Sequence, residues 1–286
     1  MRFVSYRIDG RPGYGLVNDG GIVDLTRRLG DRHGELAGLI ASGDLQEVET
    51  FTTTEPDLAL DAIDFDLPVP RPGKILCVGV NYVDRNAEYK DGSDQPSYPS
   101  LFMRTPGSLA GHHEPILRPP ESEQFDYEGE IVMVIGKAGR RIPEDKAEDH
   151  VFGLTIMNEG SIRDWMRHGK FNVTQGKNFE RSGALGPWIT TRDETPAFDN
   201  LNVITRVNGE ERQNGHTADL LFPFSRLIAY ISTFMELHPG DVISTGTPTG
   251  SGIRLDPPQF LKPGDTVEVE VPGIGTLTNT VADEQA

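Results

Sequence analysis

The chain has 286 residues, enough for one large domain or for a large and a small one. It carries 27 lysine and arginine residues against 44 aspartate and glutamate residues, and this net charge of −17 argues against binding to nucleic acid or to an anionic membrane surface. The single cysteine, Cys77, excludes an intrachain disulfide and a cysteine-based metal site, and we expect it to be a buried core thiol. The sequence has no signal-peptide pattern and no apolar run long enough to span a membrane, so we expect a soluble, cytoplasmic protein.

Glycine and proline interrupt many short apolar runs, which is typical of a β-rich fold with tight turns. Residues 1–67 begin with two strand-like runs, FVSYRI and GYGLV, and continue into an amphipathic stretch from Leu36 to Val48. We interpret them as a small N-terminal α+β domain. The proline-rich segment from Pro68 to Lys74 marks the predicted boundary, and a larger catalytic domain is predicted over residues 71–283.

The larger domain is predicted to consist mainly of strands. A strand from Lys74 to Val80 leads into a polar segment rich in glycine, proline and aspartate, a candidate lid with a helical turn at residues 84–89. The further predicted elements, in chain order, are the strands LFMRT, PILRP and EIVMVIGK, a helix at residues 143–149, the strand VFGLTIM, a short helix at residues 161–168, the strand VITRVNG, a helix at residues 224–237, the strand DVISTG and the hairpin VEVEVPGIGTLTNTV.

Three carboxylates lie in otherwise apolar stretches: Glu128 and Glu130 in FDYEGEIVMVIGK, and Glu159 in LTIMNEGSIRDW. Residues i and i+2 of a strand face the same side, and the apolar run from Ile131 to Ile135 predicts that this strand is buried, so the first two carboxylates repel each other. A divalent cation between them removes that repulsion, and an all-oxygen ligand set favours Mg²⁺, Mn²⁺ or Ca²⁺ over zinc. The alternative is that Glu128 and Glu130 form a solvated strand edge.

An arginine follows the third carboxylate at helical spacing. If a helix begins soon after Glu159, then Glu159, Arg163 and Met166 share one face, and Arg163 lies beside the ion. The alternative is that Arg163 pairs with a helix carboxylate such as Asp164 or with an acid elsewhere in the chain.

Two loop segments contain further candidates. Lys177 in QGKNF has neither a helix nor a strand pattern, so its ammonium group could point into a cavity or simply into solvent. The stretch PGDVISTGTPTGSG could form an anion-binding concavity to which Thr245 or Thr247 adds a hydroxyl donor, or an ordinary tight turn. The sequence lacks the G-x-x-x-x-G-K-[ST] pattern, which excludes a phosphate-binding P-loop, and it lacks the G-x-S-x-G elbow and the H-E-x-x-H motif, so serine hydrolase and zincin functions have no support.

A series of motifs carries a family resemblance: KILCVGVNY, SLAGHHEPI, FDYEGEIVMVIGKAGR, GLTIMNEGSIRDW, QGKNFERSGALGPWI and PGDVISTGTPTGSG. In this order they resemble the catalytic domain of the fumarylacetoacetate hydrolase superfamily, over residues 71–281. The first 67 residues resemble, more loosely, the N-terminal part of its bacterial members. The resemblance implies a β-rich α+β fold, a roll of mixed β-sheets, that usually forms a homodimer.

The resemblance also implies a metal site and a substrate class. Mg²⁺ or Mn²⁺ would be held by Glu128, Glu130 and Glu159, and the substrates would be acylpyruvates, β-diketo acids, oxaloacetate or 2-hydroxymuconate-like enols. Such a 2-oxo acid or enol can chelate the ion, which polarises the carbonyl group. Hydrolysis of a C–C bond, decarboxylation and isomerisation all pass through the same enolate.

Four further residues take roles from the family motifs. Lys177 corresponds to the family's lysine and Arg163 to its substrate-side arginine. Gly246 and Thr247 correspond to its glycine–threonine turn. Lys177 and Thr247 are expected to balance the charge on the enolate.

The lid motif departs from the family pattern N-Y-x-D-H-A-x-E. It retains Tyr82 and Glu88, but Arg85 replaces the histidine. Arginine stays protonated, so Arg85 cannot take a proton from water, although it can bind a substrate carboxylate bidentately. We therefore assign Tyr82 and Arg85 to substrate binding and Glu88 to the role of base.

Other departures affect the metal site and the cavity wall. Glu159 replaces the usual aspartate, and Met166 replaces a common glutamine, which predicts a larger or less polar substrate tail. The histidines His112, His113 and His168 are candidates for a substitute base or, alternatively, ordinary surface or core residues.

These observations lead to one leading hypothesis and two alternatives. The leading hypothesis is a divalent-metal-dependent hydrolase of a C–C bond in an acylpyruvate or 1,3-dicarbonyl acid. The first alternative is an isomerase, tautomerase or decarboxylase that acts on a 2-oxo or enol acid. The second is a catalytically silent binding or scaffold protein.

Overall fold

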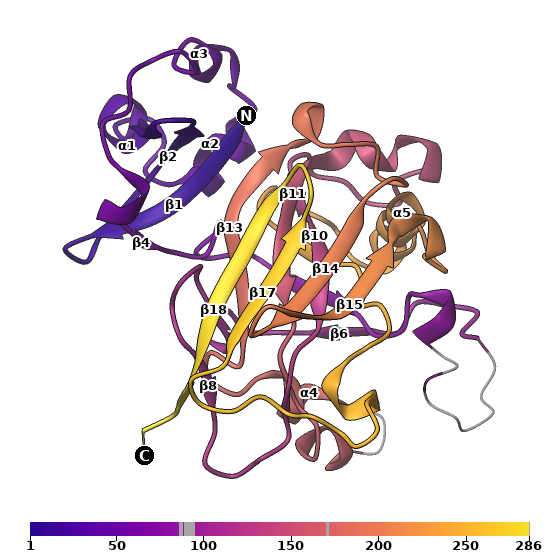
Figure 1. Cartoon of the computed structure of the whole chain (residues 1–286). Coiled ribbons are helices and arrows are strands. Elements are labelled where there is room, and N and C mark those ends of the chain that lie inside the picture. Colours follow the sequence, from indigo (N-terminus) through magenta and orange to yellow (C-terminus); the bar gives the residue numbers. More distant parts are fainter. Residues whose placement is uncertain (86–87, 89–94, 170–171, 286) are drawn as a thin grey trace.

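The computed structural model describes residues 1–85, 88, 95–169 and 172–285 (Figure 1). The first part of the chain contains the strands β1 (Arg2–Ile8), β2 (Arg11–Asn18), β3 (Gly21–Asp24) and β4 (Asp64–Phe65) and the helices α1 (Leu25–Leu29), α2 (Leu36–Ser42) and α3 (Gln46–Glu49). The remainder contains the strands β5 (Ile75–Val78), β6 (Leu101–Met103), β7 (Leu109–Ala110), β8 (Ile116–Arg118), β9 (Phe125–Asp126), β10 (Gly129–Ile135), β11 (Val151–Asn158), β12 (Ser161–Ile162), β13 (Gly183–Thr191), β14 (Asn202–Val207), β15 (Glu210–His216), β16 (Val242–Ser244), β17 (Thr266–Val271) and β18 (Gly275–Asp283). It also contains the helices α4 (Thr174–Lys177) and α5 (Phe224–Phe234) and, among its 3₁₀ turns, η2 (Val83–Arg85), η5 (Glu144–His150) and η6 (Trp165–Arg167).

Two large sheets form the body of the molecule. The first has the strand order β3-β2-β1-β13-β11-β10-β16-β5-β6, and the second has the order β15-β14-β17-β18-β8. The second sheet packs on β10, β11 and β13 of the first, as Figure 1 shows. Side chains from the facing strands, among them Ile131, Ile156 and Val269, fill the space between the sheets. The predicted β-rich α+β class is thus confirmed.

The N-terminal strands continue the first sheet rather than forming a sheet of their own. β1 pairs with β13 through Arg2 and Phe3, and β2 and β3 extend the sheet beyond β1. Helices α1 and α2 contribute Leu25, Leu36 and Leu39 to a core that covers the other face of the central strands. Because the two parts of the chain share one sheet, the division into a small domain (residues 1–67) and a larger one (residues 71–283) stays a prediction.

The strand β10 is buried along its whole length, as its apolar run predicts. It lies between β11 and β16, antiparallel to both. Each fully buried valine or isoleucine contributes about 1.5–3 kcal/mol. The apolar residues of β10 thus fix the position of the carboxylates at its start, where burial of an unpaired charge is costly.

Four strand ends converge beside these carboxylates. The start of β10 lies next to the end of β11, and the backbone N–H of Glu159 donates to the carbonyl oxygen of Glu128 at 2.7 Å. β16 pairs with β10 and runs parallel to β5. The turn after Ser244 and the segment after Val78 therefore reach the same edge of the sheet.

Several local predictions differ from the structure. Residues 161–168 do not form one helix, because Ser161 and Ile162 pair with β9 and only the turn η6 follows. The helix predicted at residues 143–149 is the 3₁₀ turn η5. Lys177 ends the short helix α4 rather than lying in a loop. The helical turn predicted at residues 84–89 begins as η2, and residues 86–87 and 89 fall outside the described residues.

Candidate active site

The three predicted metal ligands meet at the converging strand ends. One carboxylate oxygen from each of Glu128, Glu130 and Glu159 lies within 4.8 Å of the other two, and all three side chains are buried. Glu130 accepts a hydrogen bond from the Oγ of Ser244 at 2.6 Å and from the backbone N–H of Gly246 at 2.8 Å. We call Glu128, Glu130 and Glu159 the acidic cluster. The solvated strand edge is excluded as an alternative, because Glu128 and Glu130 are buried.

Among the described residues, three cations contact Glu128, one member of the acidic cluster. The Oε1 atom of Glu128 accepts from the Nη2 atoms of Arg85 and Arg163, each at 2.9 Å. Its Oε2 atom accepts from the Nζ of Lys177 and, at 3.0 Å, from the Oγ of Ser161. Every oxygen of this carboxylate is thus engaged by charged or polar donors.

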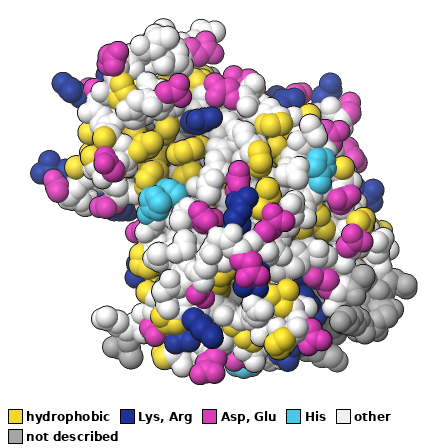
Figure 2. Space-filling view, viewed as in Figure 1, with side chains coloured by type: hydrophobic (Ala, Val, Ile, Leu, Met, Phe, Trp, Pro, Cys, Tyr) yellow, Lys and Arg dark blue, Asp and Glu magenta, His cyan; other side chains and the backbone are white. Residues whose placement is uncertain are grey.

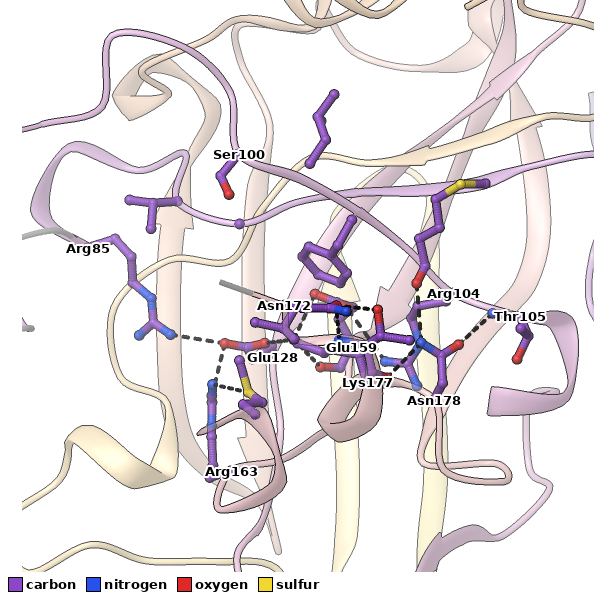
Figure 3. Close-up of a pocket in the computed structure, with 18 residues that line it drawn as sticks. Arg85, Ser100, Arg104, Thr105, Glu128, Glu159, Arg163, Asn172, Lys177 and Asn178 are labelled. Atoms are coloured by element: carbon purple, nitrogen blue, oxygen red, sulfur yellow. Dashed lines mark hydrogen bonds and ion pairs between the residues drawn. The ribbon is translucent and has the colours of Figure 1, made fainter. Parts of the chain in front are cut away.

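Glu159 is held more loosely (Figure 3). Its Oε2 atom accepts from the Nζ of Lys177 at 3.0 Å, while its Oε1 atom lies 3.5 Å from the Nη1 of Arg104. Although buried, Oε1 has no hydrogen-bond partner among the described residues. A buried carboxylate oxygen without a partner is rare, and it is an oxygen with free lone pairs for a ligand.

The acidic cluster strongly disfavours full ionisation. Burial, and then repulsion by Glu159 and Glu128, raises the pKa of Glu130 well above its ordinary value. Burial also raises the pKa of Glu159, although the charge of Lys177 opposes that shift. A divalent cation would relieve this repulsion.

Glu128 and Lys177 behave differently, since each has several partners of opposite charge. Burial opposes ionisation of Glu128, but the charges of Arg163, Lys177 and Arg85 outweigh it and hold the pKa of Glu128 well below its ordinary value. Burial likewise opposes the charged form of Lys177, but Glu128 and Glu159 raise its pKa above the ordinary value. Lys177 is therefore an ammonium ion at neutral pH, a proton donor rather than a base.

A cavity of about 800 Å³ opens over Glu128 and Glu159 of the acidic cluster, and Glu130 is not among the described residues that line it. This volume falls within the range of typical small-molecule sites, about 300–1,000 Å³. Figure 3 shows Arg85 and Arg163 beside Glu128, and Arg104 and Lys177 beside Glu159. The cavity is lined by Gly79, Val80, Arg85, Ser100, Leu101, Phe102, Met103, Arg104, Thr105, Glu128, Glu159, Arg163, Met166, Asn172, Val173, Thr174, Lys177 and Asn178.

The residues of the acidic cluster fit a divalent metal ion. They form an all-oxygen donor set, as Mg²⁺ and Mn²⁺ prefer. The Oε1 of Glu159, which has no hydrogen-bond partner among the described residues, and the raised pKa of Glu130 both fit a cation at this place. Lys177 supplies one positive charge but leaves Glu130 without an ion pair among the described residues.

The lid residues Arg85 and Glu88 are joined to the acidic cluster. The Nη1 atom of Arg85 contacts the Oε2 of Glu88 at 2.5 Å and the Oγ of Ser251 at 2.9 Å. The Oε1 of Glu88 accepts from the backbone N–H of Gly250 at 2.8 Å. Arg85 thus joins the predicted metal ligand Glu128 to the predicted base, Glu88, which is not itself among the described residues that line the cavity.

Three predicted substrate-binding residues make other contacts in the structure. Tyr82 is buried and pairs with Leu220, and Gly246 uses its N–H to hold Glu130. The hydroxyl of Thr247 donates to the carbonyl oxygen of Gly129 at 3.0 Å. None of Tyr82, Gly246 and Thr247 is among the described residues that line the cavity. Their roles in substrate binding stay predictions.

Arg163 and Met166 do line the cavity, but not for the predicted reason. They do not share a helix with Glu159, because residues 161–162 form a strand. The Nη1 of Arg163 instead lies 3.8 Å from the sulfur of Met166. The alternative of pairing with an acid elsewhere is present in the structure: Arg163 binds Asp126 at 2.7 Å, and not Asp164.

The three histidines lie apart from the acidic cluster. His112 and His113 stack on each other with ring centroids 3.7 Å apart and pack against Phe65. His168 packs against Trp165. None of these histidines is among the described residues that line the cavity. They therefore have no structural support as a substitute base.

Sequence reasoning missed four residues of the site. Arg104 lies in LFMRT, which was interpreted only as a strand, yet its side chain is buried beside Glu159. Asp126 accepts from Arg163 and from the N–H of Gly252 at 2.8 Å. The hydroxyls of Ser161 and Ser251 bind Glu128 and Arg85. An arginine inside an apolar strand was the one signal that could have identified Arg104.

The model for the C-terminal domain of fumarylacetoacetate (FAA) hydrolase matches residues 74–282. The chain therefore belongs to this family of enzymes, and the predicted fold and family are confirmed. Oxaloacetate tautomerase YisK of Bacillus subtilis (strain 168) is 36% identical over 302 residues, which cover 98% of this chain and 100% of the relative. The human mitochondrial oxaloacetate tautomerase FAHD2A is 40% identical over 227 residues, 79% of this chain and 72% of the relative.

A solved structure with the same fold contains a metal ion. Maleylpyruvate hydrolase from Sphingobium sp. SYK-6, in complex with manganese (II) ion and pyruvate, has a TM-score of 0.82 and 26% identity, with 100% of both chains covered. The two oxaloacetate tautomerases named above support the tautomerase alternative better than the leading hydrolase hypothesis. Among the described residues, no helix has the length and apolarity needed to cross a membrane.

Proposed function

We propose that this chain is a divalent-metal-dependent tautomerase that interconverts the keto and enol forms of oxaloacetate or of a closely related 2-oxo dicarboxylic acid. The observation that carries the proposal is the acidic cluster at the base of the cavity, with the protonated Lys177 on one side and Arg85 on the other. The similarity to two oxaloacetate tautomerases supports this reaction.

The charged residues of the cavity suit a dianionic substrate. Glu128, Glu130 and Glu159 would hold Mg²⁺ or Mn²⁺, which when bound acts as a Lewis acid on the 2-oxo group. Arg85 and Arg163 present guanidinium groups that bind carboxylates in a planar, bidentate manner. These arginines would orient the substrate with its 2-oxo oxygen toward the acidic cluster.

Tautomerisation moves two protons, and the chain offers a group for each. Lys177 donates a proton from Nζ to the 2-oxo oxygen, since its raised pKa keeps it an ammonium ion. Glu88 accepts the proton that leaves C3, and Arg85 holds its carboxylate. The C3–H bond breaks, the O–H bond forms, and exchange with solvent restores both groups.

The lid favours tautomerisation over hydrolysis. Hydrolysis needs a base for the attacking water, and Arg85 occupies the lid position from which a histidine would act. Arginine cannot accept that proton. The enol–keto reaction requires no attacking water, so the replacement leaves it intact.

The test is direct. Enol-enriched oxaloacetate is diluted into buffer, and the decay of its ultraviolet absorbance is followed with Mn²⁺-loaded protein, chelator-treated protein and buffer alone. We expect chelator-sensitive acceleration without release of pyruvate or CO₂. An unchanged enol decay would refute the proposal.

A second candidate function is hydrolysis of the C–C bond of an acylpyruvate. The similarity to maleylpyruvate hydrolase favours it, and Glu88 would then have to activate water alone. Chelator-sensitive formation of pyruvate from an acylpyruvate, detected by mass spectrometry, would establish this reaction. A homodimer in the cytoplasm stays our expectation, and light scattering would test the oligomeric state.

A further inference from the structure

We infer that Arg104 is a positioning residue that fixes the carboxylate of Glu159 for metal binding. This inference rests on the proposed metal site. Arg104 follows the edge strand β6, and none of its side-chain surface is exposed to solvent. Figure 3 shows its guanidinium group directed toward Glu159 from the side of the cavity opposite Arg85.

The guanidinium group of Arg104 is held by four hydrogen bonds. Its Nε donates to the Oγ of Ser108 at 3.1 Å, and its Nη2 donates to the carbonyl oxygen of Ser108 at 3.0 Å and to the Oγ of Ser182 at 2.9 Å. Its Nη1 donates to the carbonyl oxygen of Gly160 at 2.9 Å. A guanidinium group has five N–H donors in a planar fork. These four bonds therefore fix the direction of the fifth.

The fifth donor, the second N–H of Nη1, is on the side of Glu159. The Nη1 atom lies 3.5 Å from Oε1, an ion-pair distance that is too long for a good charge-assisted hydrogen bond. Oε1 is buried and has no hydrogen-bond partner in the part of the chain that the structure describes, while Lys177 binds the other oxygen. Arg104 thus attracts the carboxylate without occupying the lone pairs that a metal ion would need.

A glutamate at this position needs such a restraint. Its side chain has one more rotatable bond than that of aspartate, so more conformational freedom is lost when it binds an ion in one geometry. A fixed positive charge beside Oε1 reduces that loss before the ion arrives. Groups that orient metal ligands in this way typically change metal affinity by about 10–100-fold when they are removed.

Arg104 also ties Ser108, Gly160 and Ser182 together, and that structural role must be separated from the positioning role. The separation comes from a double-mutant cycle with Glu159→Asp. Shortening residue 159 withdraws the carboxylate from Arg104 but leaves the four anchoring hydrogen bonds in place. If Arg104 has only a structural role, its replacement changes the Mn²⁺ affinity by the same factor with glutamate or aspartate at position 159. If it positions the carboxylate, that factor depends on which acid is present.

The experiment measures Mn²⁺ affinity by calorimetric titration of the full-length protein, with folding of each variant verified by circular dichroism. We expect Arg104→Lys to weaken Mn²⁺ binding about 10–100-fold in the Glu159 protein. In the Glu159→Asp protein we expect the same change to alter affinity by about twofold or less, the limit for independent sites. Ser182→Ala, which removes one anchor, should weaken binding in the same direction by less.

Each outcome decides a separate point. If Arg104→Lys weakens Mn²⁺ binding equally in both backgrounds, the positioning role is refuted while the proposed metal site stands. If the unaltered protein binds no Mn²⁺, the proposed metal site fails and the inference fails with it. Should Arg104→Lys not fold, the cycle of Ser182→Ala with Glu159→Asp replaces it, and additive effects there overturn the inference.

Discussion

The contact between Arg85 and Glu128 makes a quantitative prediction about metal binding. Arg85 is buried, and its guanidinium donates to Glu128 and to Ser251, each at 2.9 Å, and contacts Glu88 at 2.5 Å. The variant Arg85→Gln removes the positive charge but retains an amide donor. Arg85→Gln should therefore lower the free energy of unfolding of the chelator-treated protein. It should also raise the affinity for a cation that competes with Arg85 for Glu128.

The remaining partners of Glu128 set the size of the stability loss. A buried charge left without any partner costs about 3–5 kcal/mol. Glu128 keeps Arg163, Lys177 and Ser161 in the variant, so it is not left alone. The loss should be nearer that of a hydrogen bond to a charged group, about 1.5–3 kcal/mol. Urea unfolding in the presence of chelator measures this difference.

Mn²⁺ and Arg85 would compete for the carboxylate of Glu128. Because Mn²⁺ no longer has to displace the arginine in Arg85→Gln, the free energy of the lost contact is added to the free energy of Mn²⁺ binding. We expect Arg85→Gln to bind Mn²⁺ about ten- to a hundredfold more tightly in a calorimetric titration. The matched control is Arg206→Gln, which breaks a half-exposed pair with Glu270 and should leave the affinity unchanged. An unchanged or weaker affinity in Arg85→Gln would show that ion and arginine do not share Glu128.

Three further variants test the site and the core. Lys177→Met should lower the tautomerase rate by about 10²–10³-fold in the enol assay, since a buried donor to the developing oxyanion is lost, whereas the same change at the exposed Lys262 should have no effect. Arg85→His should create or improve pyruvate release from an acylpyruvate, because a histidine beside Glu88 can activate water; no gain would contradict the role given to Arg85. Burial, and then the charge of His113, lowers the pKa of His112 from 6.5 to about 3. Because the unfolded chain takes up this proton first, the contribution of the neutral histidine to the free energy of unfolding is full above pH 6.5 and is lost as the pH falls toward 3. Between pH 7 and pH 5, the free energy of unfolding of His112→Asn should therefore fall by about 2 kcal/mol less than that of the unaltered protein. Urea unfolding at the two pH values measures this difference.

The sequence predicted the central strands and the acidic cluster because both depend on local patterns. The unbroken apolar run of β10 predicts a strand that is covered on both faces, as the structure has it. The i, i+2 spacing then places Glu128 and Glu130 on the same side. Glu159 could be added because it directly follows a second apolar strand. Antiparallel pairing of β10 with β11 brings those two ends together.

The partners of these carboxylates could not be predicted in the same way. Arg104 precedes Glu159 by 55 positions, and its contact depends on how β6 and the loop after it pack against residues 160 and 182. The helix expected after Glu159 was wrong because pairing with β9 overrides the local spacing. Sequence patterns record what one element prefers, whereas these contacts are decided by neighbours far away in the chain.

The distribution of charge fits the acidic substrate that we propose for this acidic protein. At physiological ionic strength, charges more than about 8 Å apart are largely screened in solvent. The net charge of −17 therefore matters less to a bound dianion than the side chains that it touches. Among the described residues, four cations line the cavity, and each already faces a carboxylate: Arg85, Arg104, Arg163 and Lys177. A metal ion that took over the carboxylates would free part of this positive charge for the substrate, so metal binding and substrate binding should reinforce each other.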